Sequence, residues 1–137
     1  MTVPDPVYRV LDANLNRLRE ALRVIEEYFR FLRNDSTLSA ELKGIRHSLQ
    51  EIEDGLGREK LLANRDTGSD CFANENRPEE MTRKNESDIL IASFKRAQEA
   101  ARVLEEYTKI TQNPCLSEKA KSSRFILYTI EQKCLGR

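Results

Sequence analysis

The chain contains the same helical segment twice, and this repeat constrains its fold more than any other feature. Residues 12–31, DANLNRLREALRVIEEYFRF, align without gaps with residues 91–110, IASFKRAQEAARVLEEYTKI, and nine of the twenty positions are identical. The similarity continues between residues 38–53 and 116–131, where the spacing between matched residues is 78 positions and not 79, because the connection before this segment differs by one residue. The repeated unit is about forty residues long and contains two helical patterns. Because an open solenoid usually needs at least three repeats, we expect a closed packing of four helices.

The predicted fold is therefore all-α: a four-helix bundle built from two repeated helical hairpins with pseudo-twofold symmetry. A chain of 137 residues is long enough for one domain with a real core. We expect repeat one at about 8–56, a connecting loop at about 57–82 and repeat two at about 83–135. The four helices are expected to run to about residue 33, from 38 to about 56, from between 83 and 88 to about 111, and from 117 to about 134.

The composition argues against several classes of protein. Lysine and arginine number 23 and aspartate and glutamate also number 23. Because the two signs are interspersed, nucleic acid is not an expected partner. No apolar stretch approaches the length of a membrane span, and the first residues do not resemble a signal peptide. Three widely spaced cysteines and a single histidine argue against a zinc site, and reduced cysteines fit a cytoplasmic protein best.

Both copies carry charged residues close to their apolar stripe. At about 100° per residue, Arg17 projects between Val24 and Tyr28, inside the apolar arc, and Glu20 and Glu27 lie at its margin. The second copy repeats this arrangement with Arg96, Glu99 and Glu106, whereas Arg23 and Arg102 lie further round their helices. Two interpretations stay open. The pairs are structural and hold the helices in register, or they are inward cations prepared for an anionic ligand.

The connecting region contains the only stretch that combines a cation, two acids, two hydroxyls and a glycine. This stretch is Arg65–Asp70, RDTGSD. Loops of this composition can cradle phosphate or hold a metal, because glycine permits close backbone approach and aspartate suits Mg²⁺. The same residues are equally good at forming a plain turn with no ligand, and composition alone favours the plain turn.

The usual catalytic signatures are missing from the chain. It has no phosphate-binding G-x-x-x-x-G-K-[ST] motif, no G-x-G-x-x-G, no nucleophile elbow, no metal-binding histidine pair and no CxxC. The remaining arginines, carboxylates and hydroxyls suit positioning and charge neutralisation. Phosphoryl transfer is the reaction class that depends mainly on those two effects.

The repeated segments NRLREALRVIEEYFRF and FKRAQEAARVLEEYTKI, together with NRDTGSD, resemble the minimal hydroxymethylpyrimidine-phosphate kinases of thiamine biosynthesis. These are small proteins found alone or fused ahead of thiamine-phosphate synthase. The resemblance covers nearly the whole chain and implies ATP-dependent phosphorylation of 4-amino-5-hydroxymethyl-2-methylpyrimidine phosphate to the diphosphate, with Mg²⁺ and ATP as co-substrate. Two positions depart from the expected pattern: Ser93 stands where asparagine is expected, and Cys71-Phe72 stands in place of small aliphatic residues.

On this hypothesis, each candidate residue has a role in binding phosphates, the pyrimidine or the metal. The expected catalytic residues are Arg17, Arg96, Arg65 and Asp66, and the expected Mg²⁺ ligands are Asp66 and Asp70. The expected substrate-binding residues are Asn14, Glu20, Arg23, Glu27, Tyr28, Thr67, Glu99, Arg102, Glu106 and Tyr107.

A second hypothesis is a non-catalytic helical module for oligomerisation or partner binding, associated with thiamine-phosphate synthase. A third is a ligand-binding regulator. The candidate partners are therefore ATP, the pyrimidine phosphate, a second copy of the chain, and the synthase itself.

Overall fold

The structure is a computed structural model that describes residues 5–76 and 81–136, and within those ranges it contains helices and no strands. The elements are α1 (Pro6–Glu27), a π-helical segment η1 (Tyr28–Leu32), α2 (Ser36–Leu56), α3 (Arg58–Ala63), a short 3₁₀ segment η2 (Thr67–Ser69), α4 (Glu86–Thr108) and α5 (Leu116–Leu135). The all-α prediction is confirmed. The described residues form five α-helices where four were expected, because the start of the connecting region folds into the short α3.

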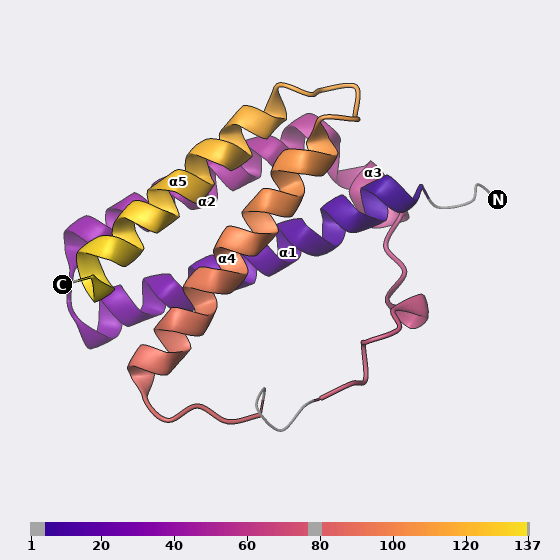
Figure 1. Cartoon of the computed structure of the whole chain (residues 1–137). Coiled ribbons are helices and arrows are strands. Elements are labelled where there is room, and N and C mark those ends of the chain that lie inside the picture. Colours follow the sequence, from indigo (N-terminus) through magenta and orange to yellow (C-terminus); the bar gives the residue numbers. More distant parts are fainter. Residues whose placement is uncertain (1–4, 77–80, 137) are drawn as a thin grey trace.

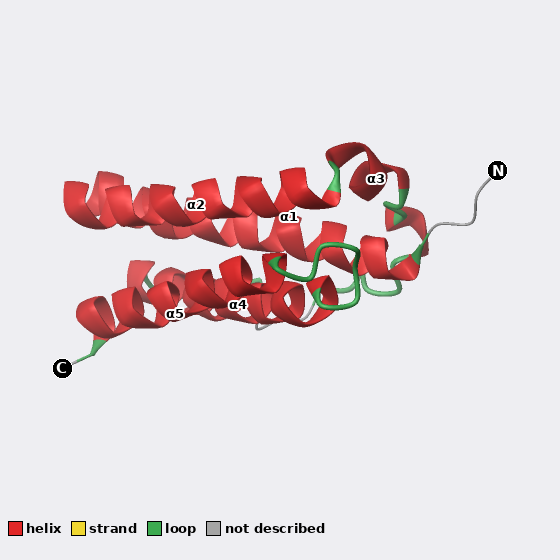
Figure 2. Ribbon diagram, turned by 90° about the horizontal axis from the view of Figure 1, so that it is seen from above, coloured by secondary structure: helices red, strands yellow, loops and turns green. Residues whose placement is uncertain are grey.

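The four long helices form two layers. Figure 2 shows α1 and α2 in one layer and α4 and α5 in the other. In Figure 1, α4 crosses α1 and α5 runs along α2. The helix contacts follow the same arrangement: α1 packs against α2 and α4, and α5 packs against α4 and α2. Each hairpin therefore covers the apolar face of the other.

The helices begin at polar caps that the sequence provides. The side chains of Asp5, Asp35 and Asn85 accept backbone N–H bonds at the starts of α1, α2 and α4, which satisfies donors that would otherwise have no partner. The predicted start of the third long helix, between residues 83 and 88, is confirmed. At its other end α4 stops at Thr108, three residues before the predicted end. α2 ends at Leu56 and is followed by Gly57, which has a φ of 94°.

One continuous core lies between the layers, and the two copies contribute to it unequally. On α4, Phe94, Ala97, Ala101 and Leu104 are fully buried. The positions of α1 that correspond to the two alanines are leucines, and these are buried as well. Large side chains of the first copy therefore pack against small ones of the second, which lets α1 and α4 approach closely.

The last turn of the first long helix is a π-helix. The N–H of Arg33 donates to the carbonyl of Tyr28 at 3.2 Å, five residues earlier. Asn34 follows with a φ of 51°, and Asp35 then caps α2. The first helical segment therefore extends nearly as far as predicted, but with a widened final turn.

Within residues 5–76 and 81–136, none of the helices combines the length and the apolar character needed to span a membrane.

Candidate functional site

An open groove of about 620 Å³ lies between α1 and α4. Five side chains from each helix line it, and each one on α4 is 79 positions after one on α1. The five pairs are Asn14 and Ser93, Arg17 and Arg96, Glu20 and Glu99, Ala21 and Ala100, and Val24 and Val103. The structure therefore brings together five of the predicted site residues, together with Ser93 and the apolar positions between them.

The two arginines of the groove are exposed to solvent. The prediction that Arg17 and Arg96 point into the apolar interior is wrong, although both face the same groove. The reason lies in the margin of the apolar arc, because Val24 is 40 % exposed and Tyr28 is only half-buried. Because this side of the arc is only partly covered by the described residues, a side chain projecting there meets the groove and not the core.

Arg17 and Arg96 also differ from the other repeated arginines in their partners. Neither forms an ion pair among the residues that the structure describes, and Arg17 makes only a long hydrogen bond of 3.5 Å to the side-chain oxygen of Asn14. By contrast, Arg23 and Arg102 each lie within 4.0 Å of two carboxylates of their own helix. Arg23 and Arg102 are therefore paired within their own helices, whereas the guanidinium donors of Arg17 and Arg96 form no ion pair in the described part of the chain.

Two buried ion pairs were not predicted from the sequence. Glu26 on α1 pairs with Arg46 on α2, and Glu105 on α4 pairs with Arg124 on α5, the latter at 2.9 Å. The carboxylates are 1 % and 6 % exposed. Hydrogen bonds to Tyr128 and Glu105 raise the pKa of Arg124. All four positions match between the copies, and that shared identity was the signal that could have revealed them.

The RDTGSD loop lies against the first half of α1, outside the lining of the groove. The guanidinium of Arg65 donates to both carboxylate oxygens of Asp12, at 2.8 and 2.9 Å, and this pairing raises the pKa of Arg65. Arg9 donates to the backbone carbonyl of Asp66 at 2.9 Å. Arg65 lines a separate hollow of about 240 Å³, between α1, α2 and α3. The structure therefore does not bring this loop together with Arg17 and Arg96.

Within the loop, the acidic side chains make bonds that are typical of turns. The carboxylate of Asp66 accepts from the N–H of Ser69 at 3.2 Å, and that of Asp70 accepts from the N–H of Phe72 at 3.0 Å. The exposed Thr67 offers its carbonyl to the N–H of Asp70. In the described part of the chain, no three His, Cys, Asp or Glu side chains cluster as metal ligands would. Mg²⁺ with ATP as co-substrate stays a prediction.

Six further predicted substrate-binding residues lie outside the lining of the groove. They are Arg23, Glu27, Tyr28, Arg102, Glu106 and Tyr107. The hydroxyl of Tyr28 accepts from Arg33 at 3.0 Å, and a hydrogen bond from Lys109 lowers the pKa of Glu106. Five of these six side chains have local partners, and the sixth, Tyr107, is 39 % exposed. The candidate site reduces to the residues that both copies present to one groove.

The fold and the groove together define an all-helical protein whose polar site is built from two matched helices. The chain belongs to the ThiD2 family, which matches residues 9–133.

Several curated relatives have similar sequences. A thiamine-phosphate synthase of Thermosynechococcus vestitus is 47 % identical over 124 residues, which is 90 % of this chain and 34 % of the relative. Thiamine-phosphate synthases of Nostoc punctiforme and Rhodopirellula baltica are each 41 % identical, over 98 % and 75 % of this chain and 37 % and 28 % of the relatives. The chain thus spans about a third of the length of the curated relatives it matches. No solved structure is significantly similar to it.

These relatives correct the activity expected from the sequence. The prediction of a hydroxymethylpyrimidine-phosphate kinase is wrong, because the relatives bear the name of the synthase and not of a kinase. The predicted connection with thiamine biosynthesis agrees with their names.

Proposed function

We propose that this chain acts in the formation of thiamine phosphate as a helical module that binds a phosphorylated compound in the groove between α1 and α4. The names of the relatives indicate thiamine biosynthesis, and the side chains of the groove indicate which kind of compound it binds. In this proposal the module works together with thiamine-phosphate synthase. The relatives that bear this name match the chain over about a third of their length, and the other two thirds lie outside the match.

The observation that carries the proposal is the unpaired state of the two groove arginines. Arg17 and Arg96 form no ion pair among the described residues, although Glu20 and Glu99 line the same groove. A guanidinium presents its donors in a planar fork that matches phosphate oxygens. Two guanidinium groups from different helices can therefore bind one phosphate or diphosphate group between them.

The carboxylates of the groove define the rest of the ligand. Ionised glutamates only accept hydrogen bonds, so Glu20 and Glu99 favour a ligand that carries amino or hydroxyl donors as well as a phosphate. An aminopyrimidine phosphate, the compound class implied by the family resemblance, has both groups. The groove volume of about 620 Å³ lies within the range of small-molecule sites.

The same proposal includes a four-helix bundle with an approximate twofold axis between the hairpins. The recurrence of contacts supports it: the Glu26–Arg46 pair of the first hairpin corresponds to the Glu105–Arg124 pair of the second. The five matched pairs of groove residues support it as well. A twofold axis between the hairpins would place the same kinds of side chain at the two ends of the groove.

Isothermal titration calorimetry of the purified chain tests the proposal. The ligands are 4-amino-5-hydroxymethyl-2-methylpyrimidine phosphate, thiamine phosphate and their unphosphorylated forms. We expect a phosphorylated ligand to bind and its unphosphorylated form to bind at least tenfold more weakly. Arg17→Ala and Arg96→Ala should each weaken binding by about tenfold to hundredfold, since each removes a charged hydrogen bond worth about 1.5–3 kcal/mol.

Arg102→Ala is the matched control, because Arg102 lies on the same helix as Arg96 and pairs with glutamates outside the groove. It should leave the affinity unchanged. The proposal is overturned if no phosphorylated ligand binds, or if the groove variants bind as tightly as the original chain.

A second candidate function, partner binding, has its own observation. Phe125 and Ile126 on α5 are exposed and line a largely apolar hollow with Ile45 of α2. An apolar patch of this kind suits a protein interface. If it docks the synthase, Phe125→Asp should abolish co-elution of the two proteins in size-exclusion chromatography without changing ligand affinity in the groove. Co-elution that survives this change would reject the patch as the interface.

A further inference from the structure

We propose that the groove between α1 and α4 binds its ligand asymmetrically, with the phosphate on the α4 side beside Arg96, and that Ser93 fixes this placement through a hydrogen bond from its hydroxyl to the phosphate. This inference rests on the proposed function. It adds the side of the groove on which the phosphate lies, and it assigns a binding role to a residue that the sequence did not single out as part of a site.

The lining of the groove is almost the same in the two copies. Four of its five matched pairs consist of identical residues, and only Asn14 and Ser93 differ. Identical side chains on α1 and α4 offer a phosphate the same kinds of contact on either side. A preference for one side therefore has to come from the differing pair or from what adjoins the groove.

The two residues of the differing pair are both buried, but only one of them has hydrogen-bond partners. Asn14 is 4 % exposed, and its amide donates to the carbonyl of Val10 at 2.9 Å while its side-chain oxygen accepts from Arg17 at 3.5 Å. Ser93 is 7 % exposed, and its hydroxyl makes no hydrogen bond to the residues that the structure describes. Because buried polar groups are normally hydrogen-bonded, a hydroxyl that faces a groove without a partner favours a ligand that supplies one.

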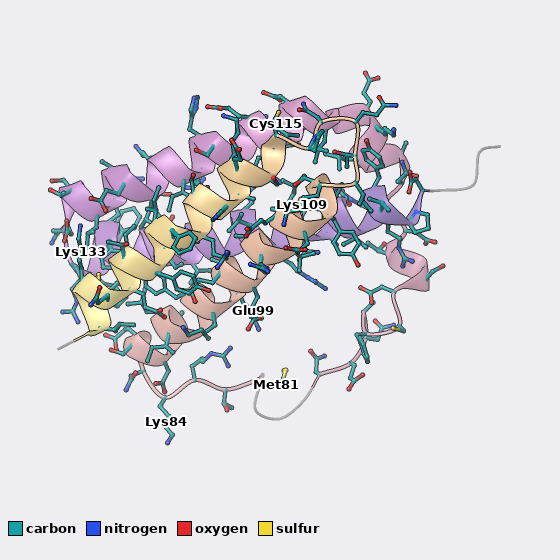
Figure 3. The ribbon with its side chains drawn as sticks, turned by 45° about the horizontal axis from the view of Figure 1, so that its top comes forward. Met81, Lys84, Glu99, Lys109, Cys115 and Lys133 are labelled. Carbon is teal, nitrogen blue, oxygen red and sulfur yellow. The ribbon has the colours of Figure 1, made fainter. Side chains whose placement is uncertain are left out.

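A second cavity, of about 280 Å³, adjoins the groove on the side of Ser93. Val24, Ser93 and Arg96 line both spaces. In Figure 3, the labelled Glu99 of the groove points from α4 towards the side on which Met81 lies, and Met81 lines the second cavity. The α4 side of the groove therefore opens into a further space beside Arg96.

This second cavity makes the α4 side the more cationic side of the groove. Both charged side chains in its described lining are arginines, Arg83 and Arg96, and Thr82 and Ser93 add hydroxyl groups. Ser93 and Arg96 are three residues apart on α4 and are therefore neighbours on one face of the helix. A phosphate bound there can accept from the guanidinium and from the hydroxyl together, which are the donors that suit its oxygens.

Calorimetry of the purified chain with 4-amino-5-hydroxymethyl-2-methylpyrimidine phosphate tests this placement. Ser93→Ala should weaken binding about tenfold, because it removes a hydrogen bond to a charged group. Arg96→Ala should weaken binding more than Arg17→Ala does, since only the first arginine lies beside the serine.

A double-mutant cycle shows which arginine shares the phosphate with Ser93. Groups that bind the same phosphate are coupled, so the loss in Ser93→Ala combined with Arg96→Ala should differ from the product of the two single losses by about threefold or more. In combination with Arg17→Ala, the two single losses should simply multiply.

Ser93→Asn gives the second copy the residue of the first and is the variant that tests direction. In that background, Arg17→Ala and Arg96→Ala should weaken binding equally. Ser123→Ala is the matched control, because Ser123 is a buried serine of α5 that lines neither cavity. It should leave the affinity unchanged, and circular dichroism should show that the variants keep their helices.

This inference and the proposed function fail in different ways. If the ligand binds the original chain but binds Ser93→Ala as tightly, or if Arg17→Ala weakens binding as much as Arg96→Ala, the asymmetric placement is refuted and the groove stands. If the ligand does not bind the original chain, the proposed function itself is refuted, and the placement with it.

Discussion

Arginine and glutamate occur both inside the two hairpins and in the groove between them, but they behave differently in the two places. Inside the hairpins, Glu26 and Glu105 are buried and each is neutralised by an arginine of the next helix. In the groove, Arg17 and Arg96 are exposed and form no ion pair among the described residues. The comparison shows that the repeated glutamates facing their own hairpin are held in ion pairs, whereas the repeated arginines facing the other hairpin form none in the described part of the chain.

The largest expected effect comes from breaking a buried pair. Arg124→Ala leaves the carboxylate of Glu105 buried without its main partner, and such a change typically costs about 3–5 kcal/mol. We therefore expect the free energy of unfolding, measured by urea denaturation, to fall by about 3 kcal/mol.

The double variant Glu105→Leu with Arg124→Met is the control for this experiment. It removes both charges and keeps similar volumes, so most of the lost stability should return. A single variant as stable as the original chain would show that the hairpin pair is dispensable and would remove the contrast with the groove.

A smaller effect is expected in the connecting loop. Asp66→Ala removes the carboxylate that caps η2, and loss of a cap costs about 0.5–1 kcal/mol. Because Asp66 does not line the groove, calorimetry should give the same affinity for a phosphorylated ligand as before. A large loss of affinity at unchanged stability would place this loop in the binding site and extend the site beyond the two matched helices.

The smallest effect on stability is expected in the groove itself. Arg17→Met and Arg96→Met exchange exposed arginines that form no ion pair, so each should change the free energy of unfolding by no more than about 0.5 kcal/mol. The same urea experiment measures it. Losses comparable with that of Arg124→Ala would mean that the groove arginines also hold the helices together, and the distinction between the two regions would disappear.

Much of the fold could be predicted because the core residues follow a helical period in both copies. Leu11, Leu15, Leu18 and Leu22 are spaced for one face of a helix, and all are buried. The short α3 was less predictable, because six residues are too few for a periodic pattern, and it is held by the burial of Leu61.

The site was predictable only in part. Helical periodicity places Arg17 inside the apolar arc of its helix, but it cannot show whether another helix covers that part of the arc. In the RDTGSD loop, composition was compatible with either a ligand site or a turn, and the contacts of Asp66 and Asp70 are those of a turn.

The π-helical turn at the end of the first long helix bears on how the two copies diverged in length. Corresponding residues are 79 positions apart in α1 and α4 but 78 apart in α2 and α5, so the first copy has one more residue between its helices. A π-helical turn spans one residue more than an α-helical turn, and Tyr28–Leu32 is where the first copy can hold it. The corresponding helix end of the second copy is narrower. There the N–H groups of Lys109, Ile110 and Thr111 each donate to the carbonyl three residues earlier. A single-residue insertion or deletion was thus absorbed inside a helix end, and the matched faces of both hairpins kept their alignment.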